Sequence, residues 1–378
     1  MKKLETDLIH QGYDPMFATG AVAMPIVLST TFERAADGSF MEGRDIYARA
    51  SNPNRRSLEE KLTLIEKGTD AMAFSSGQAA TMSIMHTLKY GDHVLLPDDI
   101  YYGTKVLLQN LYSGFGLQYD TIDMTNPDLV SKSIKSNTKL IWIETPSNPS
   151  LKITDLQAIA SIAKEKNIIT ACDNTWATPY FTKPFEFGID LIMHSSTKYF
   201  GGHSDIIGGA VIVNGNESLA QKIRDFQILG GAVPSSFDSW LLCRSLATFP
   251  IRMKVHGENA MALAHFLNSH PKIEKVNYPG LSTNEYHAVA SVQMKNGYGG
   301  MLSILVKGGA PEALKLASNL NTITHATSLG GVESLVDHRQ SAEGAHSVSP
   351  PNLLRVSVGI ENIDDLIRDF DQALALDR

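Results

Sequence analysis

Residues 140–213 contain the four apolar runs that decide the fold: LIWI at 140–143, IITAC at 168–172, LIMH at 191–194 and AVIV at 210–213. Polar or turn-forming residues bound each run, and apolar residues recur at helical spacing over 156–165, between the first two runs. Strands that are apolar along their whole length are typical of a mostly parallel sheet covered by helices on both faces. The sequence therefore predicts an α/β fold.

The alternation of strands and helices continues towards the N-terminus. Short strands are expected at 70–75 and 93–96, and helices at 54–67 and 79–89. The first 50 residues are rich in Gly, Pro, Thr and Met without a clear period, which indicates an extended arm with no core of its own.

The pattern changes after Pro250. A long helix is expected over 255–269 and a closing helix over 362–375. Further strands are expected at 273–277, 301–306 and 353–358. These elements predict a smaller α+β domain. The chain accordingly divides into an arm (1–50), a large domain (51–254) and a smaller C-terminal domain (255–378).

Composition excludes several classes of protein. The chain has 378 residues, 43% of them hydrophobic and 19% charged, which is enough apolar material for a sizeable core. A formal net charge of -7 is poorly suited to binding nucleic acid or an anionic membrane. Two cysteines, Cys172 and Cys243, allow neither a disulfide framework nor a cysteine-based zinc site, and we expect no metal. Without a signal peptide or a bilayer-spanning stretch, a cytoplasmic location is expected.

Three polar segments follow predicted strands. Ser76-Gly77-Gln78 opens a predicted helix, where backbone N–H groups and the helix dipole favour an anion. Asp173 ends the run at 168–172, on the side where open α/β sheets bind ligands. Taken singly, the first segment equally fits a capped strand-to-helix turn, and a lone Asp-Asn is more often a turn cap.

The third segment follows the run at 191–194. Ser195, Thr197 and Lys198 place polar groups and an amine at one strand end. A lysine whose pKa is lowered by burial or a nearby cation can form an imine with an aldehyde, although a lone Ser-x-Thr-Lys is more often a surface feature. An anion cradle, an acid and an amine in this order are the parts of a pyridoxal-phosphate (PLP) site.

Many short motifs across the chain match one known family. They include PI at 25–26, STTF at 29–32, YAR at 47–49, NP at 52–53, SSG at 75–77, ETPSNP at 144–149, DNT at 173–175, SSTKY at 195–199, GGAVP at 230–234, SLGG at 328–331 and RVSVG at 355–359. The sequence resembles the cystathionine γ-synthase/γ-lyase family, also called the Cys/Met metabolism family of PLP enzymes. The resemblance implies an aspartate aminotransferase-like, PLP-dependent transferase fold.

The resemblance also implies roles for single residues. Lys198 would hold the cofactor covalently and later move protons, and Asp173 would pair with the pyridine nitrogen. Tyr101 would stack on the ring and help to move a proton. The residues implied to hold the phosphate are Ser76, Gly77, Gln78, Ser195 and Thr197.

The remaining implied roles concern substrate and assembly. Asn148 would lie near the ring hydroxyl and the substrate, and Arg355 with Ser328 would bind the substrate's α-carboxylate. Tyr47 and Arg49 would reach the phosphate of a neighbouring subunit. The arm, 1–50, would therefore contact that subunit in a homo-oligomer, usually a tetramer built as a dimer of dimers.

Several positions depart from the family pattern. Tyr102 stands where Gly is expected, so that either Tyr101 or Tyr102 can be the stacking residue. Val106 replaces an Arg and Thr327 replaces a Glu that are usual in enzymes acting on cystathionine. Losing both charges favours a shorter or less polar substrate.

Other positions bear on the distal end of the substrate. LVDHR at 335–339 replaces an expected Met-Thr-His-Ala stretch, and Lys105 or Arg339 can compensate for the lost charges. His203 and His325 are interpreted as structural, because Lys198 already supplies a base.

The predicted function is therefore a PLP-dependent enzyme acting on a sulfur amino acid or a homoserine ester, by γ-elimination or γ-replacement. A methionine γ-lyase, a cystathionine β-lyase and a non-catalytic PLP-binding protein are the alternatives. The set of Lys198, Asp173 and Arg355 argues against the last.

Overall fold

A computed structural model gives the structure of the chain and describes residues 3–12, 20–344, 347 and 349–376. Its main feature is a seven-stranded sheet in the order β1-β7-β6-β5-β4-β2-β3. The strands are β1 (Asp70–Phe74), β2 (His93–Pro97), β3 (Gln118–Ile122), β4 (Thr138–Glu144), β5 (Ile169–Asp173), β6 (Leu191–His194) and β7 (Gly209–Val213). Five neighbouring strands, β3, β2, β4, β5 and β6, pair in parallel. Strand β7 is antiparallel to both of its neighbours, β6 and β1, so that β1 runs in the same direction as the five. The predicted mostly parallel α/β sheet is confirmed.

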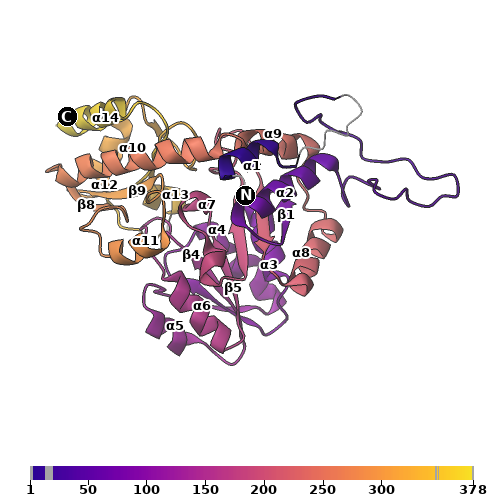
Figure 1. Cartoon of the computed structure of the whole chain (residues 1–378). Helices are drawn as coiled ribbons and strands as arrows, with labels where there is room; N and C mark the ends of the chain where they lie inside the picture. The colour runs from indigo at the N-terminus through magenta and orange to yellow at the C-terminus, as the bar shows by residue number, and fades with distance from the viewer. Residues whose placement is uncertain (1–2, 13–19, 345–346, 348, 377–378) are drawn as a thin grey trace.

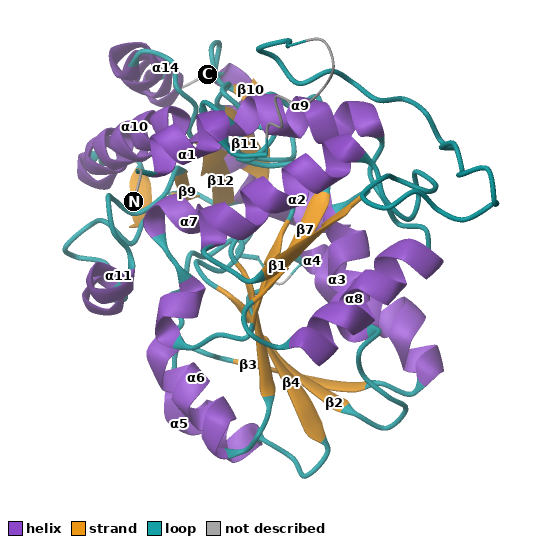
Figure 2. Cartoon of the chain, turned by 45° about the vertical axis from the view of Figure 1, so that its right-hand side comes forward, coloured by secondary structure: helices purple, strands orange, loops and turns teal. Residues whose placement is uncertain are grey.

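Helices cover both faces of this sheet (Figure 2). Successive residues of β4 point to opposite faces of the sheet. Trp142 packs in the hydrophobic cluster that contains residues of α3 and α8. Ile143 packs in the cluster that contains residues of α6. Both side chains are fully buried, which explains why these strands are apolar throughout. The helices and turns of this part are α2 (Pro53–Glu66), α3 (Gly77–Met85), α4 (Tyr102–Leu107), the π-helical η1 (Leu108–Tyr112), the 3-10 turns η2 (Ser113–Phe115) and η3 (Pro184–Phe187), α5 (Pro127–Ser133), α6 (Leu156–Glu165), α7 (Thr178–Phe181), α8 (Glu217–Leu229) and α9 (Ser236–Leu246).

A second sheet of five strands, in the order β10-β11-β12-β9-β8, forms the C-terminal part. Its strands are β8 (Ile273–Asn277), β9 (Met301–Val306), β10 (Thr324–His325), β11 (Leu335–His338) and β12 (Leu353–Ser357). Its helices are α11 (His287–Gln293), α12 (Ala310–Asn319), α13 (Arg339–Glu343) and α14 (Ile363–Ala375). The strands pair antiparallel except for β10 with β11.

Helix α10 (Phe249–Ser269) joins the two parts. It begins six residues before the predicted helix, and its first turns pack Phe249 and Met253 into the core that also contains residues of α2 and α9. Its later turns pack Leu263 and Leu267 against the second sheet. The predicted boundary at 254/255 therefore falls inside a continuous helix, and the division into domains remains a proposal.

The first 50 residues are not wholly extended, because α1 (Leu4–His10) is helical. Its Leu8 is fully buried in the same core as Leu58 and Leu62 of α2. From residue 20 to α2 the chain runs as an irregular arm away from the body (Figures 1 and 2), with one isolated bridge between Thr31 and Tyr47.

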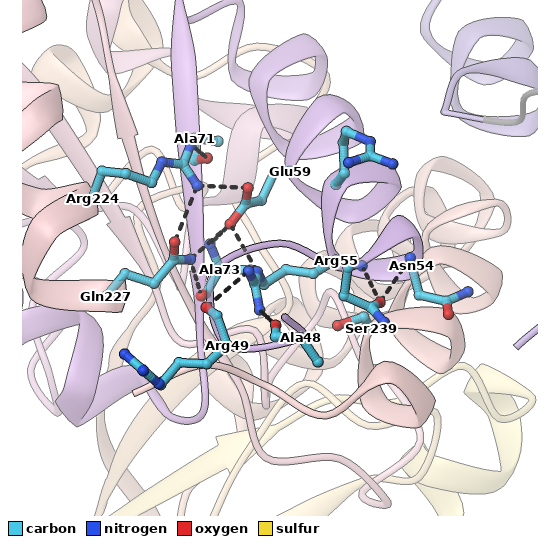
Figure 3. Close-up of polar contacts among 12 residues, drawn as sticks. Ala48, Arg49, Asn54, Arg55, Glu59, Ala71, Ala73, Arg224, Gln227 and Ser239 are labelled. Carbon is cyan, nitrogen blue, oxygen red and sulfur yellow. Dashed lines mark hydrogen bonds and ion pairs between the residues drawn. The ribbon is translucent and has the colours of Figure 1, made fainter. Parts of the chain in front are cut away.

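The end of the arm is fixed to the body by a buried arginine. Arg55 donates hydrogen bonds to the carbonyl oxygens of Ala48 and Arg49, at 2.8 and 3.2 Å (Figure 3). Glu59, one turn later, accepts from Arg224 at 2.7 Å and from Gln227 at 2.7 Å, which ties α2 to α8. The backbone that carries Arg49 is thereby held in place.

Among the described residues, no helix is both long enough and apolar enough to cross a membrane.

Candidate active site

A cavity of about 460 Å³ lies at the carboxyl ends of the parallel strands, where open α/β sheets bind ligands. Thirteen residues from different parts of the chain are predicted to form the site, and eleven of them line the cavity: Ser76, Gly77, Gln78, Tyr101, Asn148, Asp173, Ser195, Thr197, Lys198, Ser328 and Arg355. The other two, Tyr47 and Arg49, are not among its lining residues.

One end of the cavity is built from backbone and hydroxyl groups. Ser76 caps α3, its Oγ accepting from the Ala79 N–H at 3.1 Å. Gly77 follows, and a Cβ there would lie 2.9 Å from Cβ and Oγ of Ser195, so that a larger residue would force the two segments apart. Thr197 Oγ accepts from the Gly208 N–H at 3.0 Å. Helix N–H groups and hydroxyls gathered in this way suit an anion such as a phosphate.

Two carboxylates end neighbouring strands beside this cradle. Asp173 of β5 and Glu144 of β4 are register partners, and both are buried. Burial raises the pKa of each, and the charge of Asp173 raises that of Glu144 further. Asp173 accepts from the Thr175 N–H at 3.0 Å, and Glu144 from the Tyr101 N–H at 2.9 Å. Two buried carboxyl groups attract a proton or a cation.

Lys198 lies four residues after the end of β6, and its Nζ donates to Ser328 Oγ at 2.8 Å. Burial, and then the charges of Arg355 and Arg339, lower the pKa of Lys198 to about 8. The uncharged amine, which is the form that attacks an aldehyde, is therefore more populated near neutral pH than in an ordinary lysine. Ser328 has φ of 88°, a costly conformation for a residue with a Cβ, as is found at sites that hold a reactive group in position.

Arg355, on β12, is held rigidly by three acceptors. Its guanidinium donates to Asn148 Oδ1 at 3.2 Å, to the Ser328 carbonyl oxygen at 3.1 Å and to Asp337 Oδ2 at 3.1 Å. Burial and the neighbouring Arg339 lower the pKa of Arg355 to about 10. It remains a cation at neutral pH and is oriented to bind a carboxylate.

Tyr101, which caps α4, and Tyr102, its first residue, both line the cavity, so that either can be the stacking residue. The ring of Tyr101 and the amide of Gln78 lie close to Gly103. A Cβ added to Gly103 would be 2.4 Å from Tyr101 Cε1 and 2.7 Å from Gln78 Nε2. Gly103 therefore has to be small for Tyr101 to take this position.

Of the two candidates for recognising a distal group, Arg339 lines the cavity, whereas Lys105 is absent from its described lining. Val106 is absent from it too, and Thr327 is present. His203 and His325 are exposed and lie outside this lining; His203 Nδ1 contacts the Gly201 carbonyl oxygen at 2.9 Å.

Sequence reasoning assigned no role to Glu144, Thr175, Asp337 or Glu343. Glu144 carries a signal that was available, since an acid that ends an apolar run at 140–143 repeats the pattern of Asp173. The sequence contains no such signal for Asp337 and Glu343. Asp337 of β11 forms ion pairs with Arg339 and Arg355, and Glu343 of α13 forms one with Arg339, and these contacts depend on the three-dimensional fold.

Comparison with known proteins agrees with this geometry. A family profile described as Cys/Met metabolism PLP-dependent enzyme matches residues 5–375. The chain belongs to this family. The predicted family and fold are confirmed, and the protein is a PLP-dependent enzyme of sulfur amino-acid metabolism.

The relatives of this Cys/Met metabolism enzyme carry different reaction names. The cystathionine gamma-synthase of Mycobacterium tuberculosis (strain ATCC 25618 / H37Rv) is 43% identical over 375 residues, which are 98% of this chain and 96% of that protein. The cystathionine beta-lyase of Coxiella burnetii (strain RSA 493 / Nine Mile phase I) is 42% identical over 382 residues, 98% of this chain and 97% of that protein. The crystal structure of cystathionine gamma-lyase from Lactobacillus plantarum, complexed with L-serine, matches with a TM-score of 0.93 and 36% identity, covering 99% of both chains.

The residues of the cavity fit PLP. The cradle of Ser76, Gly77 and Thr197 suits its phosphate, the buried carboxylate of Asp173 suits its ring nitrogen, and the amine of Lys198 suits its aldehyde. A protonated ring nitrogen would also balance the carboxylate that burial otherwise disfavours.

Proposed function

We propose that the enzyme catalyses γ-elimination or γ-replacement on an amino acid with a leaving group at Cγ, as in cystathionine γ-lyases and γ-synthases. The observation that carries this proposal is Lys198 Nζ beside Ser328 Oγ at 2.8 Å, with Arg355 bound to the Ser328 carbonyl oxygen. A substrate whose α-carboxylate binds Arg355 presents Cα and Cβ to this amine.

The residues then have distinct tasks. When bound, PLP withdraws electrons from the substrate and so makes its Cα proton acidic. Asp173 holds a proton on the ring nitrogen, which maintains that electron demand. Once the substrate has displaced it from the cofactor, Lys198, with its pKa lowered to about 8, can take the proton from Cα. It gives this proton up to the bound cofactor–substrate pair before it takes a second one from Cβ, which primes the γ-substituent to leave.

The substrate in this proposal carries fewer charges than cystathionine. Neither Lys105 nor Val106 is part of the described cavity lining, and Thr327 contributes an uncharged hydroxyl. We therefore expect appreciable activity on a smaller substrate, such as methionine, homocysteine or a homoserine ester.

A β-elimination is the second candidate, because the Coxiella relative named cystathionine beta-lyase is 42% identical. Cleavage at Cγ yields 2-oxobutanoate, whereas cleavage at Cβ yields pyruvate from cysteine or cystathionine.

The purified enzyme should form 2-oxobutanoate and ammonia from L-methionine or L-homocysteine, or a thioether from an activated homoserine ester and cysteine. L-cystathionine and L-cysteine are offered in parallel, and each product is quantified. Pyruvate from L-cystathionine or L-cysteine, with neither 2-oxobutanoate nor a thioether from any of the substrates, would contradict cleavage at Cγ. A strong preference for cystathionine over methionine and homocysteine would contradict the smaller substrate.

We also propose that each active site is shared between two subunits of a homo-oligomer, in which Tyr47 and Arg49 reach a neighbour's phosphate. Tyr47 is 46% exposed and the arm leaves the body of its own chain. The Arg49 guanidinium instead donates to the Ile228 carbonyl oxygen at 2.7 Å, at the end of α8.

Complementation tests the shared site. Arg49→Ala should weaken PLP retention and activity, and Lys198→Ala should be inactive. In a mixed dimer one site combines the intact Lys198 of one chain with the intact Arg49 of the other. An equimolar mixture that has exchanged subunits should regain about a quarter of wild-type activity, since half of the dimers carry one intact site of two. Exchange verified by mass spectrometry without any recovery would refute the sharing.

A further inference from the structure

A buried carboxylate contacts the strand ends that carry the site. Glu66, the last residue of α2, is 1% exposed. Its Oε1 lies 2.5 Å from His194 Nε2 and accepts from Asn174 Nδ2 at 3.0 Å. Asn174 directly follows Asp173 at the end of β5. His194 ends β6 directly before Ser195. Glu66 therefore holds the neighbours of two residues that line the cavity.

Glu66 and His194 form an ion pair in which the proton belongs to the imidazole. A histidine ring is ordinarily more basic than a carboxylate, and the N–H of Asn174 stabilises the carboxylate further. Glu66 Oε2 has no hydrogen-bond partner, and no other side chain forms an ion pair with Glu66, within residues 3–12, 20–344, 347 and 349–376. Because a buried charge needs a partner of opposite sign, His194 is the cation that balances Glu66.

The imidazole of His194 lies close enough to Asp173 to affect its charge. Asp173 is the register partner of Met193, the residue before His194. Burial raises the pKa of Asp173, the hydrogen bonds with Thr175 lower it, and the charge of His194 lowers it as well. His194 is 1% exposed and packs on Phe200, with 4.4 Å between ring centroids. Water is thus kept from the imidazole, and its charge is poorly screened.

We propose that Glu66 and His194 are positioning residues that keep a proton on the ring nitrogen of bound PLP. The Glu66 carboxylate holds His194 as a cation, and this cation keeps Asp173 ionised. An ionised Asp173 leaves the shared proton on the ring nitrogen, where the electron demand of the reaction requires it. The inference rests on the proposed function in one respect, namely the pairing of Asp173 with the ring nitrogen.

Solid-state ¹⁵N NMR of frozen holoenzyme, loaded with PLP that is labelled at the ring nitrogen, tests the inference without turnover. A protonated and an unprotonated ring nitrogen have separate chemical shifts. Glu66→Gln keeps an oxygen that accepts from Asn174 but loses the charge. Its ¹⁵N signal should move from the wild-type position towards that of Asp173→Asn, in which the ring nitrogen has no carboxylate partner. In addition, kcat should fall by about tenfold and KM should change by less than about threefold, because a nearby charge alters the proton affinity of a carboxylate by about tenfold or more.

Three further variants sharpen the result. His194→Gln removes the cation but keeps an amide that can donate to Glu66, and it should move the signal in the same direction. Glu66→Gln/His194→Gln should match the single variants rather than add their effects, because both residues act along one path. This charge-balanced enzyme also serves the comparison if a single variant does not fold. Glu59→Gln is the matched control, a partly buried carboxylate of the same helix in ion pairs with Arg224 and Arg55, and its signal should stay at the wild-type position.

The outcomes separate this inference from the function on which it rests. A wild-type signal in Glu66→Gln and His194→Gln, beside a shifted signal in Asp173→Asn, would overturn the role of the ion pair and leave that of Asp173. An equal shift in Glu59→Gln would assign the effect to a general disturbance of α2 and overturn the inference too. An unchanged signal in Asp173→Asn would contradict the pairing of Asp173 with the ring nitrogen, and with it the proposed function. Shifted signals in the Glu66 and His194 variants, without formation of 2-oxobutanoate or a thioether by the wild type, would contradict the proposed reaction and leave the inference standing.

Discussion

Replacing Lys198 with alanine should lower kcat by about 10⁴-fold or more, the largest loss expected for any substitution in this protein. The variant loses both the covalent attachment of PLP and the base that acts at Cα and Cβ. Arg355, Asp173 and the cradle remain, so the variant should still bind PLP, although dialysis should remove it.

Steady-state kinetics and cofactor absorbance after dialysis measure the two losses. Lys254→Ala, whose side chain is 65% exposed next to Glu258, is the matched lysine control and should retain wild-type activity. A Lys198→Ala enzyme within about tenfold of wild-type kcat would mean that another residue is the base.

Asp173→Asn should have the second-largest effect and should lower kcat by about 10²- to 10³-fold. The amide has the shape of the carboxylate but no charge, so it cannot hold a proton on the ring nitrogen. Substrate affinity should change little, because Arg355 and Ser328 are untouched. Full kinetics with one substrate separate kcat from KM, and a loss confined to KM would contradict the role of Asp173.

The same variant should not be less stable without cofactor. Burial raises the pKa of Asp173, so the folded chain binds a proton there more tightly than the unfolded chain. Its contribution to stability is therefore fully present below the ordinary pKa of 3.8 that it has in the unfolded chain, and is lost as the pH rises from there through the folded pKa. Asparagine cannot ionise, and the PLP-free variant should have an equal or higher Tm than the wild type at pH 7. A lower Tm would mean that the ionised carboxylate stabilises the fold.

The strands that bear the site were predictable because burial on both faces makes them apolar. The run at 191–194 coincides with β6, and the run at 168–172 differs from β5 by one residue at each end. Parallel strands bring their carboxyl ends to one edge, so the cavity location followed from Asp173 and Lys198. β3 was missed because, as an edge strand, it is only partly buried and lacks an apolar run.

The other half of the site could not be derived from periodicity. Arg355 and Ser328 were found through the family resemblance, because nothing local to β12 indicates that it meets β6 across the cavity. The pairing of Arg339 with Asp337 and Glu343 depends on how β11 and α13 are placed, which three-dimensional contacts alone reveal.

Reduction of the purified enzyme with borohydride, followed by peptide mass spectrometry, shows directly whether Lys198 holds the cofactor. Reduction fixes the cofactor to the amine that holds it. We expect one modified peptide, containing Lys198, with close to one cofactor per chain. A cofactor fixed to a peptide without Lys198, or no fixed cofactor in a yellow and active enzyme, would show that Lys198 does not hold PLP.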